Sequence, residues 1–367
     1  MHRASTSSPP SKNPSTSCLV LFIDGQPGDS VGPRPDLGTA LSQPGIGTER
    51  VADPQAALER LDLVAVDLVL AHPAVAGRDP EGLAGITASF PELPVLVLEP
   101  AEDCSPPALL GAPRNLERIR AAVEQAEMQR RIKRFNTRAM MFDDALDRMY
   151  LVHQPILRAR TGCVVGHEAL LRICGPRFVG AEPFLTLARE LRREDEVDDR
   201  VRFLLSREFE DGAHFHTFFM NLHMDELCRG VLGSERDPLA PHASRVVLEF
   251  GHDLQLPEGR AVRDTLARIR ALGYRLAIGD LSISRADLLR LRSLQPEIYK
   301  IGVSSIHRCD LDAQKRAHIR EIVELAHAEG ALVVAQGIER AEEREVAVEL
   351  GADLLQGFLI GLPQASL

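Results

Sequence analysis

Residues 163–172, CVVGHEALLR, form an apolar run that carries Glu168 and Arg172 towards its end. Similar runs recur along the chain and are separated by helix-like segments such as EVDDRVRFLLSREFE (196–210). They read YLVHQPIL (150–157), HTFFMNL (216–222), RVVLEF (245–250), YRLAIGD (274–280), EIYKIG (297–302), ALVVAQG (331–337) and DLLQGFLI (353–360). Eight strands that alternate with helices predict a (β/α)8 barrel of the TIM type in the C-terminal part of an α/β protein.

Polar residues lie at the ends of these runs. In such a barrel the carboxyl ends of the strands carry the chemistry. A ring of oxygen-bearing side chains from several strands is what Mg²⁺ prefers as ligands. The residues at these positions are Glu168, Arg172, Asn221, Glu249, Asp280, Lys300, Gln336, Glu339 and Gln356.

Several motifs in this part of the chain resemble those of EAL-domain proteins, the phosphodiesterases of the bacterial messenger cyclic di-GMP. They occur in the family's order and read QPI, GHEALLR, MNL, LEF, YKIG, VVAQGIE and LLQGF. Any one alone is weak, but together they are specific. The resemblance covers roughly residues 148–365. It implies a modified barrel with one reversed strand.

The resemblance also implies a site in which two metal ions, Mg²⁺ or Mn²⁺, hold the water that attacks a phosphodiester. The implied metal ligands are Glu168, Asn221, Glu249 and Asp280. Glu168, Lys300 and Glu339 match catalytic positions, with Lys300 orienting the water. The implied nucleotide contacts are Gln154, Leu170, Arg172, Asp199, Asn221 and Gln356.

The metal-binding positions depart from the family pattern. Gly279 stands where the metal-bridging aspartate is expected, and Gln336 replaces a glutamate. The segment DLSIS (280–284) replaces the family's loop DFGTG. His252 replaces an acidic residue of the family pattern, and Gly302 replaces an aspartate. Loss of one well-placed electrostatic group commonly costs ~10²–10³ in rate. We therefore expect a cyclic di-GMP-binding sensor or effector that is inactive or very weak as an enzyme. The alternatives are a weak metal-dependent phosphodiesterase that yields pGpG and an interaction scaffold that ignores nucleotide.

The front part of the chain predicts a second, doubly wound domain. The strands CLVLFI (18–23), VDLVLA (66–71) and PVLVLE (94–99) alternate with the helices DPQAALERL (53–61) and DPEGLAGITASF (79–90). The Gly- and Pro-rich residues 25–47 predict a loop. The pattern resembles a receiver domain of response regulators, but His72 stands at the phosphate-accepting position. Glu99 stands where receiver domains have a Ser or Thr, and Ala112 stands where they have a Lys. Aspartyl phosphorylation is therefore not expected.

The expected organisation is a disordered tail (1–17), a degenerate receiver-like domain (18–126), a helical linker (127–147) and the barrel (148–367). The polar residues 134–138, RFNTR, suggest a break between two helices. An unidentified protein partner is expected, and the receiver-like domain or the linker helix offers a route to a homodimer.

Composition narrows the functional classes. The net charge of −10 argues against nucleic-acid binding. No apolar run reaches the ~20 residues that span a bilayer. The N-terminus lacks the apolar region of a secretory signal, so a cytoplasmic location is expected. His214 and His216 share a strand face, where satisfied or solvent-facing histidines are expected rather than a metal pair.

Overall fold

The computed structural model describes residues 18–25, 46–101, 105–210, 216–223, 226, 230–234, 236–251, 260–279 and 294–365. The chain divides into two compact units, Met1–Arg138 and Ala139–Leu367. Asp280, His214 and His252 lie outside the described residues. Within the described part of the chain, no helix is long and apolar enough to cross a membrane.

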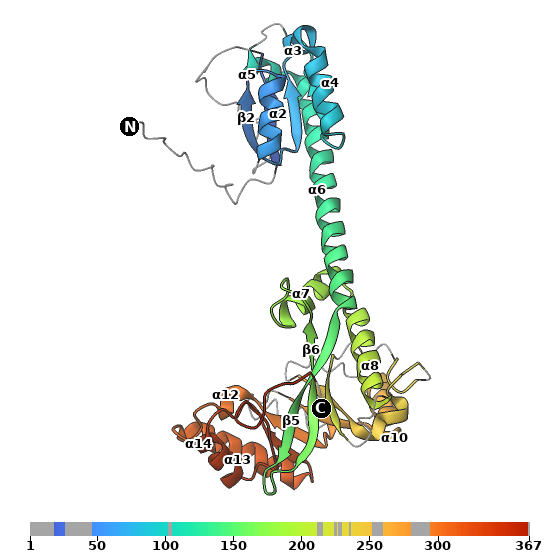
Figure 1. The fold of residues 1–367 in the computed structure, drawn as a ribbon, viewed down its shortest axis with the longest axis vertical. Helices are drawn as coiled ribbons and strands as arrows, with labels where there is room; N and C mark the ends of the chain where they lie inside the picture. The colour runs from blue at the N-terminus through green and yellow to red at the C-terminus, as the bar shows by residue number, and fades with distance from the viewer. Residues whose placement is uncertain are drawn as a thin grey trace. The chain divides into compact units, whose positions relative to one another are not determined.

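The first unit is built on a four-stranded parallel sheet in the order β2-β1-β3-β4 (Figure 1). Its strands are β1 (Cys18–Ile23), β2 (Ile46–Val51), β3 (Leu68–Ala71) and β4 (Val95–Val97). The helices are α2 (Pro54–Leu63), α3 (Pro73–Arg78), α4 (Pro80–Ser89), α5 (Pro106–Gly111) and the part of α6 (Pro113–Asp147) up to Arg138. Asp53 and Asp79 cap α2 and α4, each accepting a backbone hydrogen bond at 2.8 Å.

Alternation along β1 gives this sheet its two buried faces. Val20 and Phe22 pack with Ile119 and residues of α5 on one face. Leu21 and Ile23 pack with side chains of α2, α3 and α4 on the other. The unit is therefore a doubly wound, three-layered α/β structure, as the sequence predicts.

The structure corrects the sequence interpretation of this unit at two places. Residues 46–51 form β2; the first two of them belong to the stretch 25–47 that was expected to be loop, and the other four were not predicted to form a strand. The strand is only half-buried, and its pairing with β1 compensates for a weak local pattern. The predicted helix break at RFNTR is wrong, because α6 continues from Pro113 to Asp147. Residues 134–138 are exposed, and the four polar residues among them do not interrupt a helix that lies in water.

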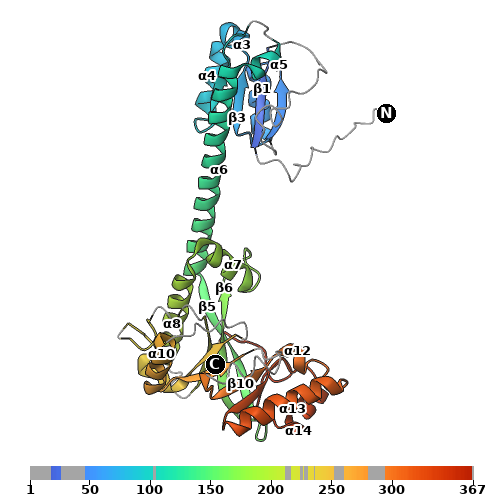
Figure 2. The ribbon, with the colours of Figure 1, turned by 180° about the vertical axis from the view of Figure 1, so that it is seen from behind.

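The second unit is a closed eight-stranded barrel (Figures 1 and 2). Its strands are β5 (Met149–Arg158), β6 (Val164–Ile173), β7 (Phe218–Leu222), β8 (Val246–Phe250), β9 (Arg275–Ile278), β10 (Ile298–Ile301), β11 (Leu332–Ala335) and β12 (Leu354–Leu355). The helices described with it are α7 (Glu182–Leu191), α8 (Glu194–Glu210), α10 (Arg260–Ala271), α12 (Val303–Ile306), α13 (Ala313–Ala328) and α14 (Ala341–Glu349), with a 3-10 turn at Ala240–Arg245. Strand β5 runs antiparallel to both of its neighbours, which confirms the expected reversed strand.

Strand alternation places a polar layer directly above an apolar one inside the barrel. The apolar layer consists of Ile156, Phe219, Val247, Ala277, Ile298, Val334 and Leu354. Because successive side chains point to opposite faces of a strand, residues two positions away point into the same interior. Those residues are Gln154, Asn221, Glu249, Gly279, Lys300, Gln336 and Gln356. The barrel thus gathers strand-end residues that are far apart in the sequence.

Candidate functional site

Lys300 is the centre of a buried charge network. Its side chain is fully buried, and Nζ lies 3.0 Å from Glu168 Oε2. The same ammonium donates a hydrogen bond to Glu249 Oε2. The ring of Phe219 lies beneath it, with its centroid 5.5 Å from Nζ. One cation from β10 therefore joins carboxylates from β6 and β8 inside the barrel.

Two glutamines extend this network. Gln356 Nε2 donates to Glu168 Oε2 at 2.6 Å and to Gln154 Oε1 at 3.2 Å. Gln154 Nε2 in turn donates to the carbonyl oxygen of Gly361 at 3.0 Å. Both glutamines are almost fully buried. The amide of Gln356 thus donates to Glu168, which favours the ionised, acceptor-only form of that carboxyl group.

Burial alone would favour neutral groups here, but the opposite charges outweigh it. Burial raises the pKa of Glu168, yet the charge of Lys300 and hydrogen bonds from Gln356, Lys300 and Asn221 lower it below its ordinary value. Burial lowers the pKa of Lys300, yet Glu168 and Glu249 raise it above its ordinary value. The carboxylate of Glu168 and the ammonium of Lys300 therefore stay charged together.

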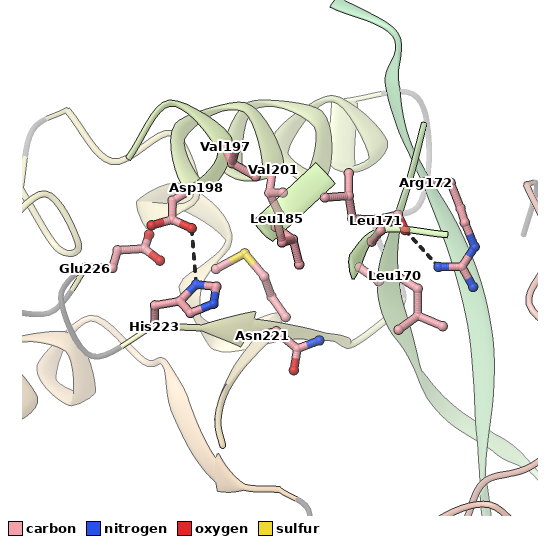
Figure 3. A pocket seen from close by; sticks show the side chains of 13 residues that line it. Leu170, Leu171, Arg172, Leu185, Val197, Asp198, Val201, Asn221, His223 and Glu226 are labelled. Carbon is pink, nitrogen blue, oxygen red and sulfur yellow. Dashed lines mark hydrogen bonds and ion pairs between the residues drawn. The ribbon is translucent and has the colours of Figure 1, made fainter. Parts of the chain in front are cut away.

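A pocket of about 160 Å³ adjoins the network and is shown in Figure 3. Leu170, Arg172 and Asn221 line it, together with apolar side chains of α7 and α8 such as Leu185, Val197 and Val201. Asn221 belongs to both regions, because it lines the pocket and hydrogen-bonds Glu168. The volume is below the ~300–1,000 Å³ typical of complete ligand sites. It suits one part of a larger ligand.

The two ends of the pocket are polar. Figure 3 shows Arg172 at one end and His223 with Asp198 at the other. His223 Nδ1 lies 3.4 Å from Asp198 Oδ1, and this hydrogen bond raises the pKa of His223. Glu226 lines the pocket as well, and sequence reasoning missed both Asp198 and Glu226. The helical spacing of Val197, Asp198 and Val201 on α8 is a signal that could have found Asp198.

Several predicted site residues lie apart from this constellation. Asp199 is exposed and pairs with Arg202 on its own helix, while Asp198 is the neighbour that lines the pocket. The side chain of Glu339 is exposed, and its backbone N–H donates to Glu343 Oε2 at 3.0 Å. Gln336 is half-buried at the end of β11, and its backbone N–H donates to Ile301.

The described residues do not fit a pair of divalent cations. Among them, no group of three or more His, Cys, Asp or Glu side chains is arranged to hold a metal ion. Glu168 and Glu249 already share the ammonium of Lys300. A Cβ added at Gly279 would lie 2.2 Å from Glu249 Oε1, so that carboxylate occupies the space of the missing side chain. A dication would have to displace Lys300 to obtain an oxygen shell.

A group of histidines comprises His153 of β5, His167 of β6 and His216, which precedes β7. The rings of His167 and His216 have centroids 5.0 Å apart, and His153 lies 5.3 Å from Phe218. Burial, followed by the charges of His216 and His153, lowers the pKa of His167 to about 4. His167 is therefore neutral at physiological pH.

His72 in the first unit has a local structural role. It precedes α3, and its Nδ1 accepts a hydrogen bond from the backbone N–H of Ala74 at 3.0 Å. At the neighbouring strand end, Asp24 is almost fully buried and pairs with Arg50. An acid at the end of β1 is thus neutralised by a basic side chain of β2.

Comparison with known proteins agrees with this architecture. The model of the EAL domain family matches residues 137–363. The cyclic di-GMP phosphodiesterase PdeF of Escherichia coli K12 is 27% identical over 265 residues, which are 69% of this chain and 35% of PdeF. The bifunctional diguanylate cyclase/cyclic di-GMP phosphodiesterase MucR of Pseudomonas aeruginosa is 29% identical over 231 residues, 60% of this chain and 34% of MucR. The chain thus spans about a third of the length of each relative.

A solved structure has the same fold. The FimX EAL domain of Xanthomonas citri, crystallised in complex with cyclic di-GMP, superposes with a TM-score of 0.58 at 18% identity. The match covers 65% of this chain and 97% of the FimX domain.

Proposed function

Because the chain belongs to the EAL domain family, we propose that it is a cyclic di-GMP-binding signalling protein with absent or very weak hydrolysis. It acts as a sensor or effector that passes the state of the nucleotide site to a protein partner. The observation that carries the proposal is the pocket beside Asn221. Three of the six residues expected to contact the nucleotide line it, namely Leu170, Arg172 and Asn221, while the adjoining acids are paired with Lys300.

The pocket offers suitable chemistry for part of a cyclic dinucleotide. Arg172 can hold a phosphate through parallel hydrogen bonds, which suits its planar guanidinium. Apolar side chains of α7 and α8 offer a surface for a base. The pair of Asp198 and His223 offers an acceptor and a donor for a base edge. None of these contacts requires a metal ion.

The site is poorly suited to hydrolysis. In-line attack on a phosphodiester by a metal-bound water needs cations held at a fixed separation. Gly279 supplies no carboxylate, and Gln336 supplies no charge. The single positive charge of Lys300 pairs with the carboxylates of both Glu168 and Glu249. Binding and hydrolysis are therefore separable in this chain.

The proposal is tested by measuring product and binding on the same preparation. Cyclic di-GMP is incubated with the chain and Mg²⁺ or Mn²⁺, and linear pGpG is quantified by chromatography. Saturable binding without pGpG is expected. Formation of pGpG that Glu168→Ala abolishes would instead identify a weak phosphodiesterase. Absence of binding, with partner capture insensitive to nucleotide and to Arg172→Ala, would identify a scaffold.

Self-association through α6 is part of the proposed signalling role. Met128, Ile132 and Phe135 are each more than half exposed, with fractions of 57%, 52% and 58%. Their spacing of four and three residues is that of a coiled-coil seam. A parallel pairing of two copies places Arg131 opposite Asn136 and Glu124 opposite Gln129, with no like-charge pair. An antiparallel pairing centred on the seam places Arg131 opposite Arg138, so a parallel homodimer is favoured.

A further inference from the structure

The barrel strand β9 ends at a residue without a side chain, and its neighbours use the space. Strand β9 lies between β8, which carries Glu249, and β10, which carries Lys300. Gly279 follows β9 directly, and its backbone N–H donates to the carbonyl oxygen of Phe250 at 2.7 Å. Contact between Glu249 and Lys300 must therefore pass over the strand at the level of Gly279.

The side chain of Glu249 rests against the Cα of Gly279. A Cβ built there would meet Glu249 Oε1 at 2.2 Å, Cδ at 3.0 Å and Cγ at 3.2 Å. Real Cβ atoms essentially never approach another heavy atom within 3.0 Å, so the end of the Glu249 side chain would have to move, and the cost of that move comes from its ion pair with Lys300. The backbone of Gly279 does not adopt the left-handed region, so conformational freedom does not account for the glycine. What residue 279 provides is space.

Glu249 uses this space to reach an internal cation. Its Oε2 accepts a hydrogen bond from Lys300, whose Nζ also lies 3.0 Å from Glu168 Oε2. Both carboxylates are more than nine-tenths buried and Lys300 is fully buried. Breaking a buried ion pair by removing or displacing one member is strongly destabilising, since it leaves an uncompensated charge. The three groups therefore depend on one another.

We propose that the missing side chain of Gly279 leaves the space that the Glu249 carboxylate fills. With Glu249 in this space, the Lys300 ammonium occupies the place of a divalent cation between Glu168 and Glu249. The glycine is then more than a lost ligand. It converts an acidic cation site into an internal ion triad that is complete without metal. This proposal concerns the ligand-free chain and does not depend on nucleotide binding.

Substitution of Gly279 tests the proposal. Gly279→Ala adds one methyl group and leaves every charge in place. Its Cβ should displace Glu249 from Lys300 and lower the melting temperature by several degrees. Gly85→Ala on α4 is the matched control, because a Cβ at residue 85 meets no atom within 4 Å. The control should leave the melting temperature unchanged or raise it slightly.

A double-mutant cycle separates the displacement of Glu249 from other effects of the methyl group. In a Glu249→Ala background there is no carboxylate to displace, so Gly279→Ala should cause little further change. Equal losses from Gly279→Ala in both backgrounds would overturn the proposal. So would a Gly279→Ala variant as stable as Gly85→Ala.

Metal uptake by the unmodified chain gives a readout that does not rely on any variant folding. Mn²⁺ alone is added without nucleotide, and free ion is quantified by electron paramagnetic resonance. The full free-ion signal is expected, because Lys300 holds both acids. Stoichiometric uptake of Mn²⁺ by the unmodified chain would overturn the proposal, even if nucleotide binding is unaffected.

Discussion

Glu168 and Lys300 are 132 positions apart in the sequence, yet Oε2 and Nζ lie 3.0 Å apart inside the barrel. Glu249 joins them from a third strand. An ammonium thus takes the position between acids where the family's chemistry would require metal. This relationship connects the stability of the ligand-free barrel with its proposed lack of hydrolysis.

Removal of the Lys300 charge should destabilise the barrel severely. Lys300→Met leaves two buried carboxylates without their cation, and breaking a buried pair in this way costs about 3–5 kcal/mol. Urea unfolding followed by circular dichroism measures the free energy of unfolding. The matched control is Lys133→Met on α6, where the lysine is 79% exposed and the change should stay within about 0.5 kcal/mol. Equal stability of the two variants would show that the ion triad contributes nothing.

Arg172 should contribute to nucleotide affinity without contributing to the fold. A hydrogen bond to a charged group is worth about 1.5–3 kcal/mol, so Arg172→Ala should weaken cyclic di-GMP binding about 10- to 150-fold. Calorimetric titration of the variant measures the loss. Arg160→Ala, an exposed arginine in the turn after β5, should bind like wild type. If Arg172→Ala kept full affinity for cyclic di-GMP, the nucleotide would not contact the end of the pocket that Arg172 forms.

A charge introduced into the α6 seam should abolish self-association. Phe135→Glu places a carboxylate where two copies would pack apolar side chains, so the proposed homodimer should become monomeric. Sedimentation velocity over a range of concentrations measures the mass. Val179→Glu is the matched control, since Val179 is 88% exposed outside the seam and should leave the dimer intact. A wild-type chain that sediments as a monomer at every concentration would contradict the proposed homodimer through α6.

His167 should make the stability of the barrel fall under mild acid. Its pKa in the folded chain is about 4, lowered by burial and by His216 and His153, against an ordinary value of 6.5. Between these values the unfolded chain binds more protons, so the free energy of unfolding decreases as the pH falls from about 6.5 to about 4. The contribution is on the order of 3 kcal/mol, at 1.36 kcal/mol per pKa unit. His167→Gln should flatten this part of the profile, and an unchanged slope would exclude His167 as its cause.

The sequence predicted the barrel well because its strands are apolar runs of the right length between helices. It also predicted five polar residues at the ends of apolar runs, and the family resemblance implied Gln154. All six lie in or beside one network: Gln154, Glu168, Asn221, Glu249, Lys300 and Gln356. Alternation explains this success, because each residue lies two positions from a residue of the apolar layer or on the adjacent strand β6.

The pairing of side chains from different elements could not be predicted from the sequence. Nothing in the spacing of Asp198 and His223 predicts that α8 and the end of β7 bring them within 3.4 Å. The short strand β2 was missed since its pairing partner, rather than its own pattern, stabilises it. Gly279 could be recognised as a missing acid from sequence, but only the structure shows Glu249 in the vacated space.

The most direct test of the central claim is a calorimetric titration of the chain with cyclic di-GMP in EDTA, repeated with Mg²⁺. We expect saturable one-to-one binding with the same affinity in both buffers, since the acids are held by Lys300 and the contacts need no metal. Binding that appears only with Mg²⁺, or no binding in either buffer, would contradict it.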